Sequence, residues 1–223
     1  MKKITKVNVR AATSGEKITF GKEILYGFHV ITHPFDGFWD LKHEKRGSVR
    51  AAFVFVAVVV VTFFYQAIGQ GYLFNPRGAY STIFSQLISV VVPIVLFVTA
   101  NWCLTTLFEG EGSFKDIFVA VSYALVPLPL LIIPSTILSN VVAENEKTVV
   151  TLLVSLAFVW AGFLIFFGTQ VTHDFSLGKN VIMIVVTIVG MVFIMFVALL
   201  FTTLLGKIVG FVSNIITEIG YRL

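Results

Sequence analysis

Five long apolar runs, none with a charged side chain or a histidine, constrain the fold of this 223-residue chain most. Each run has 18 to 26 residues, and about 20 residues of helix cross a hydrocarbon core roughly 30 Å thick. A helix also satisfies its own backbone hydrogen bonds, which lipid cannot do. The sequence therefore predicts an all-α integral membrane protein with five transmembrane helices, over residues 51–68, 83–108, 117–138, 149–168 and 181–205.

Composition supports a membrane protein and excludes a soluble globule. The chain is 57% hydrophobic and only 13% charged, whereas about a quarter of the residues of a soluble domain are charged. The single cysteine, Cys103, lies inside the second run, so no intramolecular disulfide can form. We expect one membrane domain, residues 49–205, between two polar flanks.

The flanks have patterns of their own. Residues 1–19 are polar and basic and predict a flexible tail. Residues 20–48 predict two short amphipathic helices on the cytoplasmic membrane surface, divided at Pro34. Residues 206–223 predict a second interfacial helix, bent away from the fifth span near Gly206 or Gly210. The apolar stripes are formed by Ile24, Phe28, Ile31, Phe35 and Phe38 in the first flank and by Ile208, Val212, Ile215 and Ile219 in the second.

Lysine and arginine placement predicts the orientation. Ten of the sixteen basic residues occur by Arg50, and five spans would place twelve on the side of the N-terminus and four on the other. The positive-inside rule then predicts a cell-membrane protein with a cytoplasmic N-terminus and an external C-terminus. Anionic lipid headgroups account for this basic flank, so we expect membrane lipids as partners and no nucleic acid.

The uncharged spans also bear on transport. Proton-coupled carriers usually need an ionisable group near the midplane, so the sequence disfavours that class, whereas a channel or facilitator stays open. The second span carries a polar stripe that either packs against other helices or lines a path for a substrate. This stripe contains Gln86, Ser89, Asn101 and Thr105, with Pro93 between them.

The third span contains Pro127, Pro129 and Pro134. Three prolines so close together do not fit an unbroken helix, so we expect a kink or an unwound segment around residues 127–130. Broken helices form binding sites in some transporters, but a kink filled by neighbouring helices is the other interpretation.

Candidate metal ligands are few. His29, His33, Asp36 and Asp40 would share one face of a continuous helix, but Pro34 interrupts it, and the same residues suit the wet face of an interfacial helix. The pair His173 and Asp174, in the predicted loop before the fifth span, is expected to be solvated. The sequence has no Gly-rich phosphate loop, nucleophile elbow or zinc-type cysteine cluster. We therefore expect no enzyme, no catalytic residue, no cofactor and no metal.

The central stretch ANWCLTTLFEGEGSFKDIFVAVSYALVPL resembles the bacterial branch of the Yip membrane-domain family. In that family a helix ending in Asn-Trp leads into a Gly-x-Gly-Ser/Thr-Phe turn and then a span with a Tyr-Ala-Leu-x-Pro element. The likeness extends over about residues 24–222. The Asp-Leu-Tyr-Gly-Pro motif of eukaryotic relatives is missing, so the resemblance does not imply a membrane-trafficking role.

The stretches THDFSLGKNVIMIVVTIVGM and FVSNIITEIGYR resemble a subset encoded beside carbohydrate ABC transporters. This resemblance implies a non-enzymatic accessory or scaffold subunit whose partners are transporter permease subunits. A small channel acting alone is the alternative. The residues expected to contact a partner or to pack are Gln86, Asn101, Trp102, Gly110, Gly112, Phe114, Tyr123, Pro127, His173, Glu218 and Arg222.

The turn before the third span also has a local explanation. Gly110 and Gly112 can take positive φ and close a tight connection, Ser113 can cap the following helix, and Phe114 can anchor it at the membrane interface. Glu218 and Arg222 lie one helical turn apart at the C-terminal end, and they either pair with each other or reach another subunit.

Overall fold

The computed structural model describes residues 20–76 and 82–222, so the predicted tail over residues 1–19 lies outside the described residues. Every regular element in the described part is helical, and five helical stretches are long and apolar enough to cross a membrane, as predicted. The elements are α1 (Phe20–Thr32), α2 (Pro34–His43), α3 (Val49–Gly69), α4 (Ile83–Leu107), α5 (Phe114–Ala124), α6 (Pro127–Leu138), the 3₁₀ turn η1 (Glu144–Glu146), α7 (Lys147–His173) and α8 (Leu177–Arg222).

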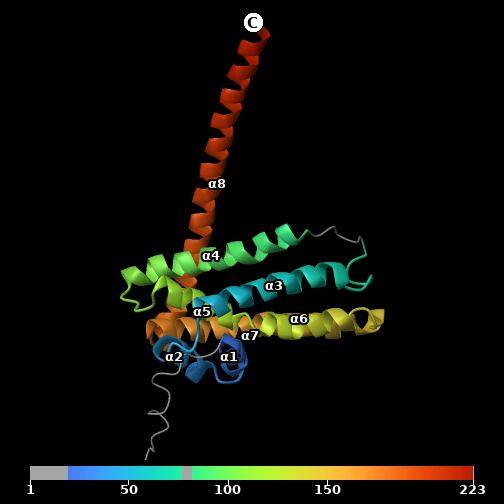
Figure 1. Ribbon diagram of the computed structural model, residues 1–223, viewed down its shortest axis with the longest axis vertical. Coiled ribbons are helices and arrows are strands. Elements are labelled where there is room, and N and C mark those ends of the chain that lie inside the picture. The colour runs from blue at the N-terminus through green and yellow to red at the C-terminus, as the bar shows by residue number, and fades with distance from the viewer. Residues whose placement is uncertain (1–19, 77–81, 223) are drawn as a thin grey trace, which may run out of the picture.

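The body of the molecule is a bundle in which α3, α4, α6 and α7 lie roughly side by side (Figure 1). Its centre is a cluster of buried aliphatic side chains from α3, α4, α5, α6 and α7, in which Val59, Val98 and Ile132 are almost fully enclosed. The valine-rich α3 is a helix despite its strand-like composition, because lipid requires backbone bonds within the segment. Ser48 caps it by accepting a hydrogen bond from the Ala51 amide.

The third span is broken, as the prolines predict. α5 ends at Ala124, and α6 begins at Pro127, so the interruption lies at Leu125 and Val126, just before the predicted segment. Both residues of the break are buried. Pro127 occupies the first position of α6, where a missing N–H costs nothing, and Pro134 lies inside α6.

α1 and α2 are separate helices divided at Pro34, as predicted, but part of their apolar surface faces protein rather than lipid. Phe38 is 1% exposed and packs where Gly168 leaves room on α7. Phe28 and Phe35, from the same predicted stripe, are half exposed. In Figure 1, α1 and α2 lie against the α5 and α7 end of the bundle. The Tyr26 hydroxyl donates a hydrogen bond to Asp40, and this bond helps fix α1 to α2. Burial and the same hydrogen bond raise the pKa of Tyr26.

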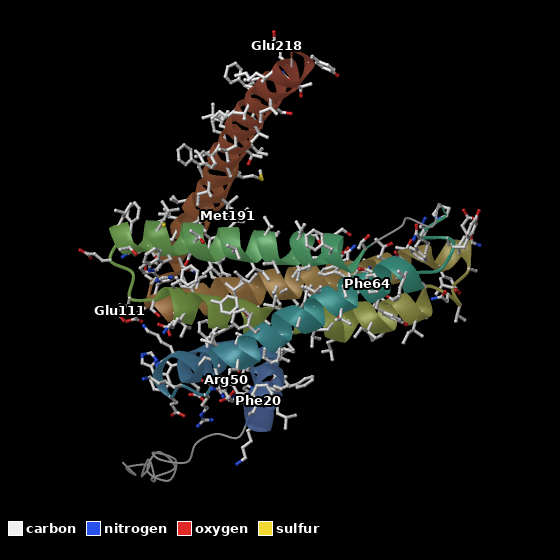
Figure 2. The ribbon with its side chains drawn as sticks, turned by 45° about the horizontal axis from the view of Figure 1, so that its top comes forward. Phe20, Arg50, Phe64, Glu111, Met191 and Glu218 are labelled. Carbon is white, nitrogen blue, oxygen red and sulfur yellow. The ribbon has the colours of Figure 1, made fainter. Side chains whose placement is uncertain are left out.

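α8 differs from the prediction. It is one helix of 46 residues, uninterrupted at Gly206 and Gly210, so the predicted bend and separate helix over residues 206–223 are wrong. Neither glycine changes the helix, because a glycine within a helix costs only about 1 kcal/mol relative to alanine. Figures 1 and 2 show α8 leaving the bundle steeply past α4. From Met195 to Tyr221, every side chain is exposed.

Candidate functional site: a buried polar relay

α4 carries its buried polar side chains near its C-terminal end. Asn101 is 1% exposed, and the Thr105 hydroxyl donates a hydrogen bond to the Asn101 carbonyl oxygen at 2.6 Å. This part of α4 packs against α8, where Gly190 lies beside Leu104. The close approach of the two helices places a polar amide between them, away from water.

α7 supplies the second group. Its last residue, His173, is 1% exposed, and Asp174 ends the helix in the left-handed conformation with φ 54°. The ring of Phe175 stacks on the His173 ring with centroids 5.2 Å apart. The ammonium group of Lys179, at the start of α8, lies over the Phe175 ring, 4.4 Å from its centroid. The turn between α7 and α8 therefore closes over the histidine.

The hydrogen bonds around His173 run in one direction. The Gly112 backbone N–H donates to His173 Nδ1 at 3.3 Å, so the proton of a neutral imidazole lies on Nε2, which donates to Asn101 Oδ1 at 2.9 Å. Asn101 Nδ2 then donates to Thr187 Oγ1 at 3.1 Å, and the Thr187 hydroxyl donates to the Met183 carbonyl at 2.7 Å. We call Gly112, His173, Asn101 and Thr187 the His173 relay.

A second polar contact holds α8 to α7 nearby. Asn180 is 1% exposed, its Nδ2 donates to the Phe166 carbonyl at 2.8 Å, and its Oδ1 lies 3.2 Å from the Thr169 hydroxyl. The relay and this contact together join α4, α7, α8 and the loop before α5. Because hydrogen bonds between membrane helices contribute about 0.6 to 2 kcal/mol each, they define how the first part of α8 is seated.

The His173 relay consists of uncharged groups that are hydrogen-bonded to one another or to the backbone. Its side chains bond one another or backbone groups, and Asn101 is engaged through both its oxygen and its nitrogen. Among residues 20–76 and 82–222, no three His, Cys, Asp or Glu side chains gather as metal ligands. The His29 and His33 rings stack on each other, while Asp40 binds Tyr26 and Arg46. The arrangement is suited to positioning helices.

His173 is where the sequence-based interpretation was wrong. The fourth span was expected to end at Gly168 and His173 to be solvated, but α7 continues to His173 and buries it. The helix continues through Gly168, which lies against the Phe38 ring; a Cβ there would approach that ring to 3.0 Å. The sequence signal that could have indicated a longer, buried helix was the pair Thr169 and Thr172, because both lie with His173 on the buried side of α7.

Gly110 and Gly112 are required for a different reason than predicted. Neither has positive φ; in this loop Glu109 does, at 59°. A Cβ on Gly110 would lie 2.7 Å from His173 Nδ1, and a Cβ on Gly112 would lie 2.7 Å from His173 Cε1. The two glycines therefore make room for the imidazole. Ser113 caps α5 as predicted, in a reciprocal pair with Asp116.

The remaining predicted residues do not form one site. Gln86 and Ser89 bond within the early part of α4, away from the buried Asn101. Trp102 and Phe114 are both exposed and meet edge to face at 6.1 Å. Tyr123 is fully buried, and its hydroxyl donates to the Glu23 carbonyl, which holds α1 against α5. Glu218 lies near the far end of α8, and the Arg222 side chain lies outside the described residues.

The model of the Yip1 domain matches residues 28–200 of the chain. The chain belongs to the Yip1 domain family. No curated protein and no solved structure matches it. The matched region of this Yip1 protein includes α2 to α7 and the first half of α8, and all four residues of the His173 relay lie inside it. The part of α8 beyond residue 200, with its fully exposed side chains, lies outside the match.

Proposed function

We propose that this Yip1 protein is a non-enzymatic accessory or scaffold subunit of the cell membrane that docks against transporter permease subunits. The observation that carries the proposal is the distal part of α8. Met195 to Tyr221 contact nothing that buries them, yet this surface is rich in large apolar side chains, including Phe196, Phe201 and Phe211. Figure 2 shows side chains pointing outward on all sides of the protruding helix between the labelled Met191 and Glu218.

The length of α8 supports a protein partner. Its 46 residues correspond to about 69 Å of helix at about 1.5 Å per residue, whereas the hydrocarbon core is about 30 Å thick. One crossing covers less than half of this length. The remaining apolar surface needs another cover, and a neighbouring membrane protein offers both apolar contact and partners for polar groups such as Lys207 and Asn214.

The class of partner comes from the resemblance of residues 172–191 and 211–222 to Yip-family proteins encoded beside carbohydrate ABC transporters. The permease subunits of such a transporter are membrane helices that the protruding α8 can contact within the bilayer. Small-residue and polar contacts between helices would supply the affinity, because apolar area alone gives no advantage over lipid.

Photo-crosslinking tests this proposal. A benzophenone side chain at Phe211, which is 66% exposed on α8, is compared with one at Val159, which is 68% exposed on α7. In cells that express the protein at native level, position 211 should crosslink to permease subunits identified by mass spectrometry, and position 159 should not. Adducts from position 211 to lipid only, or equal adducts from both positions, would contradict the proposal.

The proposal includes an orientation, with the N-terminus in the cytoplasm and the C-terminus outside. The charge distribution supports it, since ten of the sixteen lysine and arginine residues precede or begin the first span. An alkaline phosphatase fused after Leu223 should be active, and a green fluorescent protein fused there should be dark. The reverse pattern would place the C-terminus in the cytoplasm and contradict the proposed orientation.

A channel acting alone has less support. That alternative depends on a polar stripe in α4 that lines a path, but Asn101 is bonded to His173 and Thr187, and Gln86 bonds locally with Ser89. Proteoliposomes that contain the purified protein should therefore show no more solute flux than empty vesicles.

A further inference from the structure

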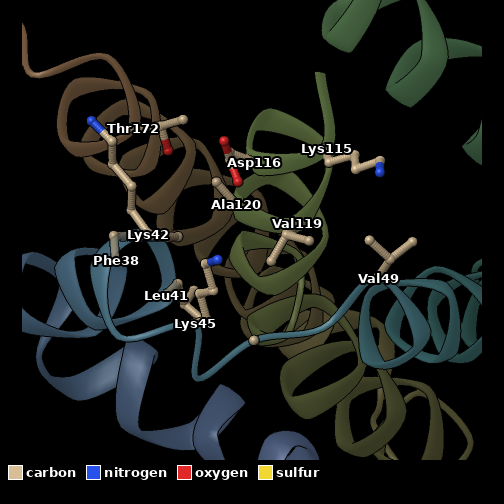
Figure 3. A pocket seen from close by; sticks show the side chains of 11 residues that line it. Phe38, Leu41, Lys42, Lys45, Val49, Lys115, Asp116, Val119, Ala120 and Thr172 are labelled. Carbon is tan, nitrogen blue, oxygen red and sulfur yellow. The ribbon is translucent and has the colours of Figure 1, made fainter. Parts of the chain in front are cut away.

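A cavity of about 200 Å³ lies where α2, the linker to α3 and α5 meet, and neither the relay nor the proposed docking helix uses it. Lys42, Lys45 and Lys115 are among its lining residues, and in Figure 3 Lys45 extends toward its middle while Lys42 and Lys115 lie at opposite edges with their ammonium groups directed outward. Asp116 is the carboxylate among its lining residues. Three lysines and one aspartate thus line the cavity or its edges.

Two of the lysines have no counterion. Lys42 forms a salt bridge with Glu111 at 3.0 Å, whereas neither Lys45 nor Lys115 takes part in a salt bridge among the described residues. The Asp116 carboxylate is already engaged, because it accepts hydrogen bonds from the Ser113 hydroxyl and amide in the cap of α5. Within the described part of the chain, the cavity therefore presents positive charge that no salt bridge neutralises.

Lys45 also has an unusual backbone. Its φ is 52°, in the left-handed region that glycine adopts most easily. A glycine would adopt this conformation at less cost than a lysine does. Figure 3 shows that side chain extending toward the centre of the cavity.

The floor of the cavity is apolar. Phe38, Leu41, Val119 and Ala120 line it beneath the lysines. A site for a small hydrophilic anion has no need of such a floor. A phosphate group attached to hydrocarbon would use both parts, with the phosphate at the lysines and the start of the acyl region on the apolar side chains.

The cavity also lies beside the starts of two candidate membrane spans. One span begins at Val49 and the other at Phe114, and Val49 itself lines the cavity. Spans begin where the polar headgroup region meets the hydrocarbon core. Basic pockets between helices at this level are suited to anionic headgroups.

We propose that this cavity binds the phosphate of an anionic phospholipid at Lys45, with Lys42 and Lys115 adding positive charge at its two edges. The proposal is independent of the partner of α8, because it rests on a different face and different residues. Lipid bound here would hold α2 to the starts of α3 and α5.

Native mass spectrometry of the full chain tests the site. Purified protein in mild detergent is mixed with equal amounts of phosphatidylglycerol and phosphatidylcholine, and the retained lipids are counted. The wild type should retain phosphatidylglycerol preferentially. Each lysine near a membrane surface contributes roughly fivefold to anionic lipid binding, so the double variant Lys45→Gln with Lys115→Gln should lose roughly 25-fold of that preference.

The matched control is Lys22→Gln with Lys207→Gln, which removes the same charge from exposed positions that do not line the cavity. It should keep the wild-type preference, and both variants should elute and unfold like the wild type, because neither changes a buried side chain. Equal loss in both variants, or no preference in the wild type, would overturn the proposal. Excess inorganic phosphate distinguishes the source: stabilisation by phosphate without retained phosphatidylglycerol would assign a soluble phosphate compound and refute the lipid.

Discussion

The Gly112 backbone N–H lies 3.3 Å from Nδ1 of His173, and the same glycine has its missing Cβ position 2.7 Å from Cε1 of that ring. The loop residue thus both donates to the histidine and gives it room. His173 is hydrogen-bonded to Asn101, and Asn101 is hydrogen-bonded to Thr187. One glycine in a connecting loop therefore contacts a hydrogen-bond chain that joins three membrane helices.

Replacement of Gly112 by alanine should destabilise the bundle by about 1 to 3 kcal/mol, because the added methyl overlaps the imidazole and moves the loop. Gly162→Ala is the matched control, since a Cβ there has nothing within 4 Å, and it should be neutral or slightly stabilising. Thermal unfolding in detergent, followed by tryptophan fluorescence, measures both. In a double-mutant cycle, His173→Ala should relieve most of the cost of Gly112→Ala; additive costs would contradict a direct clash.

Asn101→Ala should cost about 1 to 2 kcal/mol, because it leaves His173 Nε2 without an acceptor and Thr187 without its donor in a buried place. Ser89→Ala removes a hydroxyl from the exposed side of the same helix, where it bonds only to Gln86. That control should change stability by less than about 0.5 kcal/mol. The same unfolding assay compares them, and an equal loss at both positions would argue against the relay.

The anchoring of α2 on α7 can be tested at two phenylalanines of the same helix. Phe38→Ala should cost about 3 to 5 kcal/mol, because the buried ring fills the space over Gly168. Phe35→Ala should cost less than about 1.5 kcal/mol, since Phe35 is half exposed. Limited proteolysis at residues 44–48 should become faster only in Phe38→Ala. Phe35 also meets Phe167 of α7 edge to face at 4.4 Å, so equal cleavage of the two variants would show that the buried Phe38 anchors α2 no more firmly than this exposed contact does.

Acid should weaken the contact between α2 and the loop before α5. The hydrogen bond and charge of Lys42 lower the pKa of Glu111 below its ordinary 4.5. A carboxyl group with a lowered folded-state pKa stabilises the fold fully above its unfolded value and loses this contribution as pH falls through the folded value. The lysine–glutamate contribution is thus present at pH 7 and disappears below pH 4.5.

Glu111→Gln should therefore remove a small part of the acid sensitivity, seen as a flatter dependence of unfolding temperature on pH below pH 4.5. Glu109→Gln, in the same loop and without a salt bridge among the described residues, should leave the wild-type dependence. A pH profile of Glu111→Gln that overlays the wild type would contradict the pairing.

Much of the fold follows from the sequence because lipid imposes a single solution on each apolar run. The five spans, the division at Pro34, the break of the third span and the Ser113 cap are local consequences of composition, proline and capping chemistry. Each depends on residues within a few positions of one another, so a single sequence suffices to predict them.

The relay was beyond sequence reasoning because its residues come together only through tertiary contacts. Gly112 and His173 are 61 positions apart, and Asn101 and Thr187 are 86 apart. The hydropathy pattern predicts that the fourth span ends at Gly168. No local signal shows that Phe38, from a distant part of the sequence, packs beside this glycine. The course of α8 was likewise hidden, because glycines permit a bend without requiring one.

The two parts of α8 are under different evolutionary constraints, because the first part packs in the bundle and the protruding part does not. The first turns of α8 carry Asn180, Met183 and Thr187, which the bundle needs, whereas Met195 to Tyr221 contribute nothing to the bundle's own core. Substitutions in that distal arm leave the fold of the body intact. If the arm has the docking role proposed above, a lineage can change what it recognises, residue by residue, while the body it extends from stays the same.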